Sequence, residues 1–284
     1  MIVSKESIDL SGRTCIVTGA NSGIGKAVAR GLASYGATVV MACRSESRGQ
    51  AALDELKNET GSDRLHLKLV DLSEQASIRS FATDFLSEFD ALHVLVNNAG
   101  IYPAERQLSA DGIEMTWATN VMAYYLLTDL LEQRLRDCAP SRIVNVASTK
   151  AGQLRLDDLQ FEKRRFGGIA AYEQSKQANR MLSWVRAEKL KTDGVTVNVA
   201  HPGPVATGIA RHQTGLWGKA VRVAFQAFGR SAQAGGDTVL WLASSPDVDG
   251  LTGRFWAKRR ELTRSFYDPP RQIELSEYCA SMIR

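Results

Sequence analysis

The sequence predicts an α/β fold: a single domain built on a doubly wound parallel sheet with helices on both faces. Strand-like and helix-like segments alternate along the chain, a glycine-rich turn follows the first strand, and no linker, repeat or low-complexity tract divides the 284 residues. Such alternation is typical of parallel sheets, because the crossover between parallel strands usually contains a helix. We therefore interpret residues 1–284 as one domain.

The first half of the chain contains three strand–helix pairs. Each predicted strand is a short apolar or β-branched run, and each predicted helix has helical periodicity. Gly36 and Gly61 end the first two helices, because glycine readily adopts the left-handed backbone found just after a helix. Ser73 is the predicted N-cap of the third helix. In chain order we expect strand 14–18, helix 23–35, strand 38–43, helix 47–60, strand 65–70 and helix 73–89.

The second half continues this alternation with two long helices. The expected order is strand 92–96, helix 112–138, strand 142–147, helix 171–193, strand 196–200, helix 232–243 and strand 253–257. From about Arg264 the pattern becomes less regular. We therefore expect residues 264–284 to form an irregular C-terminal tail.

Composition and charge favour an ordinary globular protein. The formal net charge of +4 is small and dispersed, which argues against nucleic-acid binding. Two short basic runs, 163–165 and 258–260, fit solvated loops better than a nuclear role. The cysteines and histidines lack ligand spacing, so we expect a reducing compartment and no metal. Without an apolar signal region or a span of about twenty apolar residues, we expect a cytoplasmic protein with no integral membrane segment.

The glycine-rich turn is a candidate phosphate-binding site. It follows the first strand directly and opens the first helix, with glycines at positions 19, 23 and 25. Glycines permit a tight turn and a close backbone approach to a pyrophosphate, which then lies at the helix N-terminus. An ordinary turn is the alternative, but the position between a strand and an amphipathic helix favours a Rossmann-type dinucleotide site.

A second candidate site contains Tyr172 and Lys176. The two residues are four apart, so they share one face of a predicted helix. The lysine can favour the ionised phenolate, and the phenol can then give or take a proton near neutral pH. Ser148 ends a strand-like run upstream. Taken singly, these residues are usually a surface pair and a cap, but together with the glycine turn they indicate an oxidoreductase.

These motifs together resemble the short-chain dehydrogenase/reductase family over about residues 9–256, and Asn97-Asn98-Ala99-Gly100 is a specific match. The resemblance implies a catalytic set: Asn120, Ser148, Tyr172 and Lys176. In this set Tyr172 exchanges a proton with the carbonyl or alcohol oxygen, and Ser148 hydrogen-bonds the same oxygen. Lys176 lowers the phenol pKa and grips the nicotinamide ribose, while Asn120 anchors a water on the proton path.

The end of the second strand selects the cofactor. Enzymes that prefer NAD usually have a carboxylate there, whereas this chain has Cys43 followed by Arg44, and a guanidinium suits the 2′-phosphate of NADP(H). A solvated loop arginine is the alternative. The resemblance implies the following cofactor-binding residues: Gly19, Asn21, Ser22, Gly23, Ile24, Gly25, Arg44, Asp71, Leu72, Asn98, Ala99, Gly100, Tyr172, Lys176, Pro202, Gly203, Val205 and Thr207.

The long interval between Ser148 and Tyr172 resembles the branch of the family that contains the retinol dehydrogenases. This branch implies an NADP(H)-dependent oxidoreductase that transfers hydride between the nicotinamide and a lipophilic ketone, aldehyde or alcohol. Reduction of a C=C or C=N bond, and a cofactor-sensing binding protein, are the alternatives. Family resemblance and the two long helices, 112–138 and 171–193, also imply a homodimer or homotetramer paired across a two-fold axis.

Residues 204–230 are a candidate substrate lid. Within 216–230, apolar residues recur at helical spacing and make one face: Trp217, Val221, Ala224, Phe225 and Phe228. An apolar face at this place can shield the hydride from water and hold a lipophilic substrate. A fixed helix packed on the core and a helix on a membrane surface are the alternatives.

Overall fold

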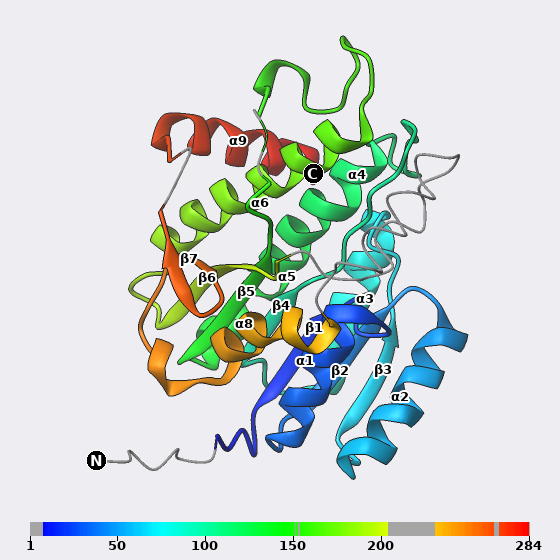
Figure 1. Cartoon of the computed structure of the whole chain (residues 1–284), viewed down its shortest axis with the longest axis vertical. Helices are drawn as coiled ribbons and strands as arrows, with labels where there is room; N and C mark the ends of the chain where they lie inside the picture. The colour runs from blue at the N-terminus through cyan, green and yellow to red at the C-terminus, as the bar shows by residue number, and fades with distance from the viewer. Residues whose placement is uncertain (1–7, 151, 153, 204–230, 264–266, 284) are drawn as a thin grey trace.

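A computed structural model describes residues 8–150, 152, 154–203, 231–263 and 267–283 as one α/β domain (Figure 1). Its eight strands form one sheet in the order β3-β2-β1-β4-β5-β6-β7-β8. Strands β1 to β7 run parallel, and β8 pairs antiparallel with β7. The predicted doubly wound parallel sheet is confirmed.

The observed elements follow the predicted alternation closely. The strands are β1 Thr14–Thr18, β2 Thr38–Cys43, β3 Leu65–Leu69, β4 Val94–Asn97, β5 Ser141–Val146, β6 Val195–His201, β7 Phe255–Ala257 and β8 Arg260–Leu262. The main helices are α1 Gly23–Ser34, α2 Glu46–Thr60, α3 Gln75–Glu88, α4 Met115–Trp117, α5 Ala123–Asp137, α6 Gly168–Lys189, α8 Ala232–Ser244 and α9 Pro269–Met282. Sequence reasoning missed β8, because its tight turn places Lys258 and Arg259 at positive φ, where glycine or asparagine is the usual signal.

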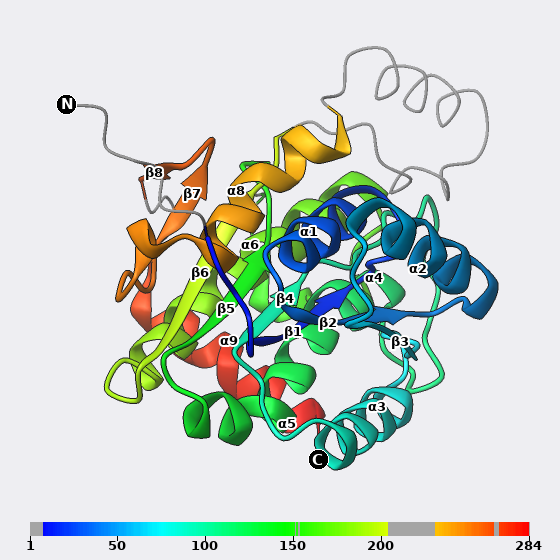
Figure 2. The same ribbon diagram turned by 90° about the horizontal axis from the view of Figure 1, so that it is seen from below.

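Two apolar layers cover the faces of the sheet. Helices α1, α2 and α8 pack on one face, and α3 and α5 pack on the other (Figure 2). Central strand residues such as Ile16 and Val17 are completely buried, one toward each layer. Strands buried on both faces appear in the sequence as continuous apolar runs, which explains why their positions were predictable.

Helix α6 begins at Gly168, three residues before the predicted start. Two other helices begin later than predicted, and in each a side-chain hydrogen bond explains the difference. The Ser73 hydroxyl donates to Asp71 Oδ1 at 2.6 Å, so Ser73 does not cap α3, which begins at Gln75. The predicted helix 112–138 begins only at Met115, because the Glu114 carboxylate accepts from the backbone N–H groups of the first turn. A π-helical turn, Ala118–Met122, then separates α4 from α5.

The predicted irregular tail is wrong, because most of it is helix α9. Asp268 caps this helix by accepting from Arg271 N at 3.3 Å, and prolines occupy its first turn. An aspartate followed by proline is a helix-start signal that the sequence contains. Leu275 and Cys279 are completely buried against α4 and α6, in a cluster with Trp117, Met181 and Trp184.

The position of α9 also bears on self-association. The helix packs along α6, one of the two helices expected to pair with a second copy (Figure 1). Met181 and Trp184 of α6 are therefore buried within one chain. This part of α6 is not open to a partner, and the expected dimer or tetramer stays a prediction. Among the described residues, none of the helices combines the length and apolar character that crossing a membrane requires.

Candidate active site

The carboxyl ends of the central strands bring the predicted site residues to one edge of the sheet. Strand β1 leads into the glycine turn, β4 into Asn98-Ala99-Gly100, β5 into Ser148 and β6 into Pro202. Ligands of doubly wound sheets bind at this edge, where the strand order reverses. In this sheet the reversal lies between β1 and β4.

The glycine turn has the geometry of a dinucleotide cradle. Gly19 and Gly23 have φ values of +66° and +56°, which L-residues with side chains rarely adopt. A Cβ at Gly25 would lie 2.4 Å from the Gly19 carbonyl oxygen and 2.5 Å from Asn98 Nδ2, so only glycine fits. Ser22, the N-cap of α1, makes no side-chain cap hydrogen bond. The first-turn N–H groups of α1 therefore remain available to a pyrophosphate.

Thr18 joins this turn to the segment after β4. Its hydroxyl oxygen accepts from the backbone N–H groups of Asn98 and Ala99, at 2.8 and 3.0 Å. The Asn98 side chain in turn donates to the Thr18 carbonyl oxygen at 2.8 Å. These bonds fix the backbone on both sides of the predicted cofactor site, as expected for the Asn-Asn-Ala-Gly segment.

The ends of β2 and β3 place a cation and a carboxylate together. Arg44 is exposed, and its Nη1 lies 3.9 Å from Asp71 Oδ2. Asp71 Oδ1 accepts from the backbone and side chain of Ser73, and Leu72 beside it is buried. Burial raises the pKa of the Cys43 thiol to about 11, so this group is neutral. Arg44 therefore places an exposed positive charge next to a carboxylate at the end of β2.

Asn120 is held in place by the π-helical turn. It is completely buried, its Oδ1 accepts from Ile101 N at 2.8 Å, and its Nδ2 donates to Ile101 O and Ser175 Oγ, both at 3.0 Å. A Cβ on Gly100 would lie 3.3 Å from Asn120 Oδ1 and 3.6 Å from Lys176 Nζ. The side chain thus ties the segment after β4 to helix α6, next to the lysine.

Tyr172 and Lys176 lie together on α6 as predicted, but their ionisation differs from the expectation. Burial raises the pKa of Tyr172 to about 12, with a further contribution from Tyr102. Burial lowers the pKa of Lys176 to about 7, which weakens the charge that was expected to ionise the phenol. The Lys176 ammonium donates to Val146 O at 3.0 Å and lies 5.8 Å from the Tyr172 ring centroid. The phenol is therefore protonated and suited to donate.

Sequence reasoning missed two further tyrosines at this site. The Tyr102 ring lies 5.4 Å from the Tyr172 ring, measured between centroids. Tyr124 donates its hydroxyl to Ala99 O at 2.8 Å, and its ring lies 5.4 Å from Lys176 Nζ. Tyr102 lies two residues after Gly100, and Tyr124 lies four residues after Asn120. This proximity to predicted site residues could have indicated both tyrosines from the sequence.

The described part of the insert before Tyr172, residues 154–167, is held by specific hydrogen bonds. Asp158 is buried and accepts from the backbone N–H groups of residues 162–164, with Arg164 as its ion-pair partner. Arg164 is therefore partly buried, unlike the solvated basic run that we expected. Gln174 of α6 donates to Leu159 O at 2.8 Å. The insert also contacts helix α9, where Arg271 donates to Leu154 O at 2.6 Å.

The segment after β6 completes this edge. Gly203 has a φ of +81°, and His201 bonds Thr149, the neighbour of Ser148, through its ring nitrogens. Ser148 itself is buried and accepts from Lys150 N at 3.0 Å. Val205, Thr207 and the candidate lid 204–230 lie outside the described residues.

A doubly wound sheet with a glycine cradle, and beside it a tyrosine paired with a buried lysine, define a nicotinamide-dependent oxidoreductase. The family model described as short chain dehydrogenase matches residues 13–215. The chain belongs to the short-chain dehydrogenase/reductase family, in the branch that contains the retinol dehydrogenases.

The relatives include curated proteins and solved structures. Human retinol dehydrogenase 12 is 38% identical over 260 residues, which cover 90% of this chain and 80% of the relative. Human dehydrogenase/reductase SDR family member 13 is 39% identical over 253 residues, or 88% of this chain and 67% of the relative. An uncharacterised protein from Mycobacterium paratuberculosis has a TM-score of 0.77 at 28% identity, covering 97% of this chain and 96% of that one. A short chain dehydrogenase from Burkholderia cenocepacia, solved with NADP, has a TM-score of 0.69 at 28% identity, covering 87% and 96%.

Proposed function

We propose that the protein is an NADP(H)-dependent oxidoreductase that acts on a lipophilic ketone, aldehyde or alcohol. The observation that carries this proposal is the protonated, partly buried phenol of Tyr172, four residues before the buried Lys176 at the cofactor edge of the sheet. When bound, the nicotinamide supplies or accepts the hydride. The protein itself then has to transfer one proton and hydrogen-bond the substrate oxygen.

Each side chain has a separate task in the proposed reaction. Tyr172 donates its proton to the substrate oxygen during reduction and takes it back during oxidation. Ser148 hydrogen-bonds the same oxygen as negative charge develops on it. Lys176 donates to the nicotinamide ribose, and its ammonium already faces this edge through Val146 O. Asn120 positions Ile101 and Ser175 around the lysine.

Three features support a cofactor with a 2′-phosphate. Cys43 replaces the carboxylate that would bind a ribose hydroxyl, Arg44 follows it, and two relatives were solved with NADP, a Burkholderia cenocepacia short chain dehydrogenase and Pseudomonas aeruginosa RhlG. The cradle formed by Gly19, Gly23 and Gly25 would hold the pyrophosphate. The guanidinium of Arg44 lies 3.9 Å from the Asp71 carboxylate, just beyond the ends of β2 and β3.

The exchange Arg44→Asp should therefore move the cofactor preference from NADPH toward NADH. A charged hydrogen bond contributes about 1.5–3 kcal/mol, so the ratio of kcat/KM values should change by roughly tenfold to a hundredfold. The matched control is Arg64→Asp, which makes the same charge change just before β3, at the opposite edge of the sheet. Equal kcat/KM for the two cofactors in the unmodified protein would contradict the NADP(H) assignment.

The substrate class rests on the names of the relatives, which include retinol dehydrogenases 11, 12 and 14. Trans-2-octenal tests the reaction type, because it carries both a C=O and a C=C bond. We expect NADPH oxidation with 2-octenol as the product, and a higher kcat/KM than for propanal. Octanal as the product would instead favour reduction of the C=C bond. Tight NADPH binding without turnover of any carbonyl tested would favour a cofactor-sensing protein. The cytoplasmic location stays a prediction.

A further inference from the structure

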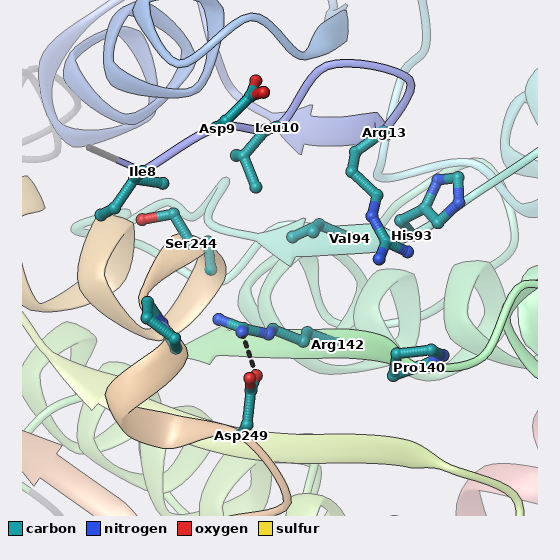
Figure 3. A pocket seen from close by; sticks show the side chains of 12 residues that line it. Ile8, Asp9, Leu10, Arg13, His93, Val94, Pro140, Arg142, Ser244 and Asp249 are labelled. Atoms are coloured by element: carbon teal, nitrogen blue, oxygen red, sulfur yellow. Dashed lines mark hydrogen bonds and ion pairs between the residues drawn. The ribbon is translucent and has the colours of Figure 1, made fainter. Parts of the chain in front are cut away.

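A cavity of about 320 Å³ lies at the edge of the sheet opposite the candidate active site (Figure 3). His93 directly precedes β4, and Arg142 is the second residue of β5. These two strands begin at the cavity and end at Asn97 and near Ser148, in the active site. The other walls come from residues 8–13, Pro140, the end of α8 and the turn 246–249.

Two hydrogen-bond donors of this cavity have no acceptor. His93 Nδ1 accepts from Thr14 N at 3.0 Å, so the neutral ring carries its hydrogen on Nε2. Neither His93 Nε2 nor the Arg13 guanidinium has a hydrogen bond or ion pair with any residue that the structure describes. Both side chains are partly buried and lie side by side at the cavity (Figure 3). Partly buried donors without acceptors favour a ligand that supplies one.

The nearby acids do not neutralise Arg13. Asp249 pairs with Arg142, which also donates to Leu242 O at 3.1 Å. Asp9 accepts from Ser11 N at 2.9 Å, and its carboxylate points away from the cavity (Figure 3). Burial, and then the charge of Arg13, lower the pKa of His93, so the imidazole is neutral at pH 7. The cavity therefore presents one uncompensated positive charge and one neutral N–H donor.

Half of the residues that line the cavity are apolar. Side chains of this kind come from four separate segments: Ile8, Leu10, Val94, Pro140, Ala243 and Pro246. An inorganic anion would leave these walls in contact with water, whereas a ligand with a hydrocarbon part would cover them. A single charge suits a monoanion better than a doubly charged phosphate.

We propose that this cavity binds a small carboxylate with an apolar body, of the medium-chain fatty acid class. Its carboxylate lies between the guanidinium of Arg13 and Nε2–H of His93, and its hydrocarbon part lies along the apolar walls. The planar fork of arginine matches the two oxygens of a carboxylate. This site is separate from the catalytic residues and does not depend on the proposed reaction.

Titration calorimetry of the full chain with octanoate tests the proposal without any turnover. We expect one saturable site that Arg13→Gln weakens by about tenfold or more, the scale of a lost charged hydrogen bond. His93→Asn keeps an acceptor for Thr14 N–H but removes the Nε2–H donor, and should weaken binding by roughly twofold to tenfold. The matched control Lys191→Gln removes an exposed cation elsewhere and should leave the affinity unchanged. Circular dichroism of each variant checks that the fold is intact.

Acetate tests the role of the apolar walls. Octanoate has methylene groups that acetate lacks, and burying only two of them would contribute about 1.6 kcal/mol. Acetate should therefore bind more than about tenfold more weakly than octanoate. Equal affinities for acetate and octanoate would overturn the assignment of an apolar ligand. The site itself would be refuted by the absence of saturable octanoate binding. It would also be refuted if the Arg13 and His93 variants bound octanoate as the unmodified protein does, which would place octanoate elsewhere, for example in the substrate cleft.

Discussion

Replacing Tyr172 with phenylalanine should lower kcat by at least about a hundredfold, the usual scale for a positioned acid–base group. The phenol of Tyr172 holds its proton at neutral pH, because burial raises its pKa to about 12. Phenylalanine keeps the ring and its packing against Tyr102, and removes only the hydroxyl. Binding of NADPH, measured by fluorescence titration, should persist.

The matched control is Tyr102→Phe, which removes the neighbouring hydroxyl and keeps that ring. Its kcat should stay within about tenfold of the unmodified value, because the loss of a hydroxyl that only borders the site costs about 1 kcal/mol. If Tyr172→Phe retained most of the turnover, or if both variants lost it equally, Tyr172 would not be the proton donor.

The second large effect concerns stability: Leu275→Ala should lower the free energy of unfolding by about 2–5 kcal/mol. Leu275 lies on the inner face of α9, completely buried against Trp117 and Met181. Truncation leaves a cavity in this cluster, which connects α9 to α4 and α6. Denaturant unfolding followed by tryptophan fluorescence measures the change, since Trp117 and Trp184 both belong to the cluster.

Ile273→Ala on the same helix is the control. The Ile273 side chain is 55% exposed, so its truncation should change stability by no more than about 0.5 kcal/mol. A large difference between the two variants would establish that α9 is an integral part of the domain. Equal, small effects would mean that α9 does not pack on α6 in solution, and that the surface of α6 is open to a second copy after all.

The long-range consequence of α9 is its contact with the insert before Tyr172. Gln160 donates to the Tyr278 hydroxyl at 2.9 Å, and Arg271 donates to Leu154 O. From the other side, Gln174 bonds the same insert two residues after Tyr172. The C-terminal helix therefore supports the loop that borders Tyr172, although the two are about a hundred residues apart.

The sequence by itself determined the sheet, the glycine turn and the four residues of the proposed catalytic set. The central strands were predictable because they are buried on both faces and are therefore apolar along their length. The turn was predictable because only glycine fits the backbone at positions such as 19 and 25. In both cases the requirement, an apolar strand or a glycine backbone conformation, concerns only a few consecutive residues. A local sequence pattern is therefore enough to predict it.

The tertiary structure alone decided features that depend on distant neighbours. Leu275 and Cys279 are four residues apart and share one face of α9, but the surface that buries them comes from α4 and α6, which lie far away in the sequence. The Ser73 hydroxyl donates to Asp71 and therefore does not cap α3 as predicted. The pKa of Tyr172 is raised rather than lowered as expected, and that of Lys176 is lowered, because burial removes the water that stabilises either charge. Burial is set by the whole packed site rather than by the spacing of the two residues.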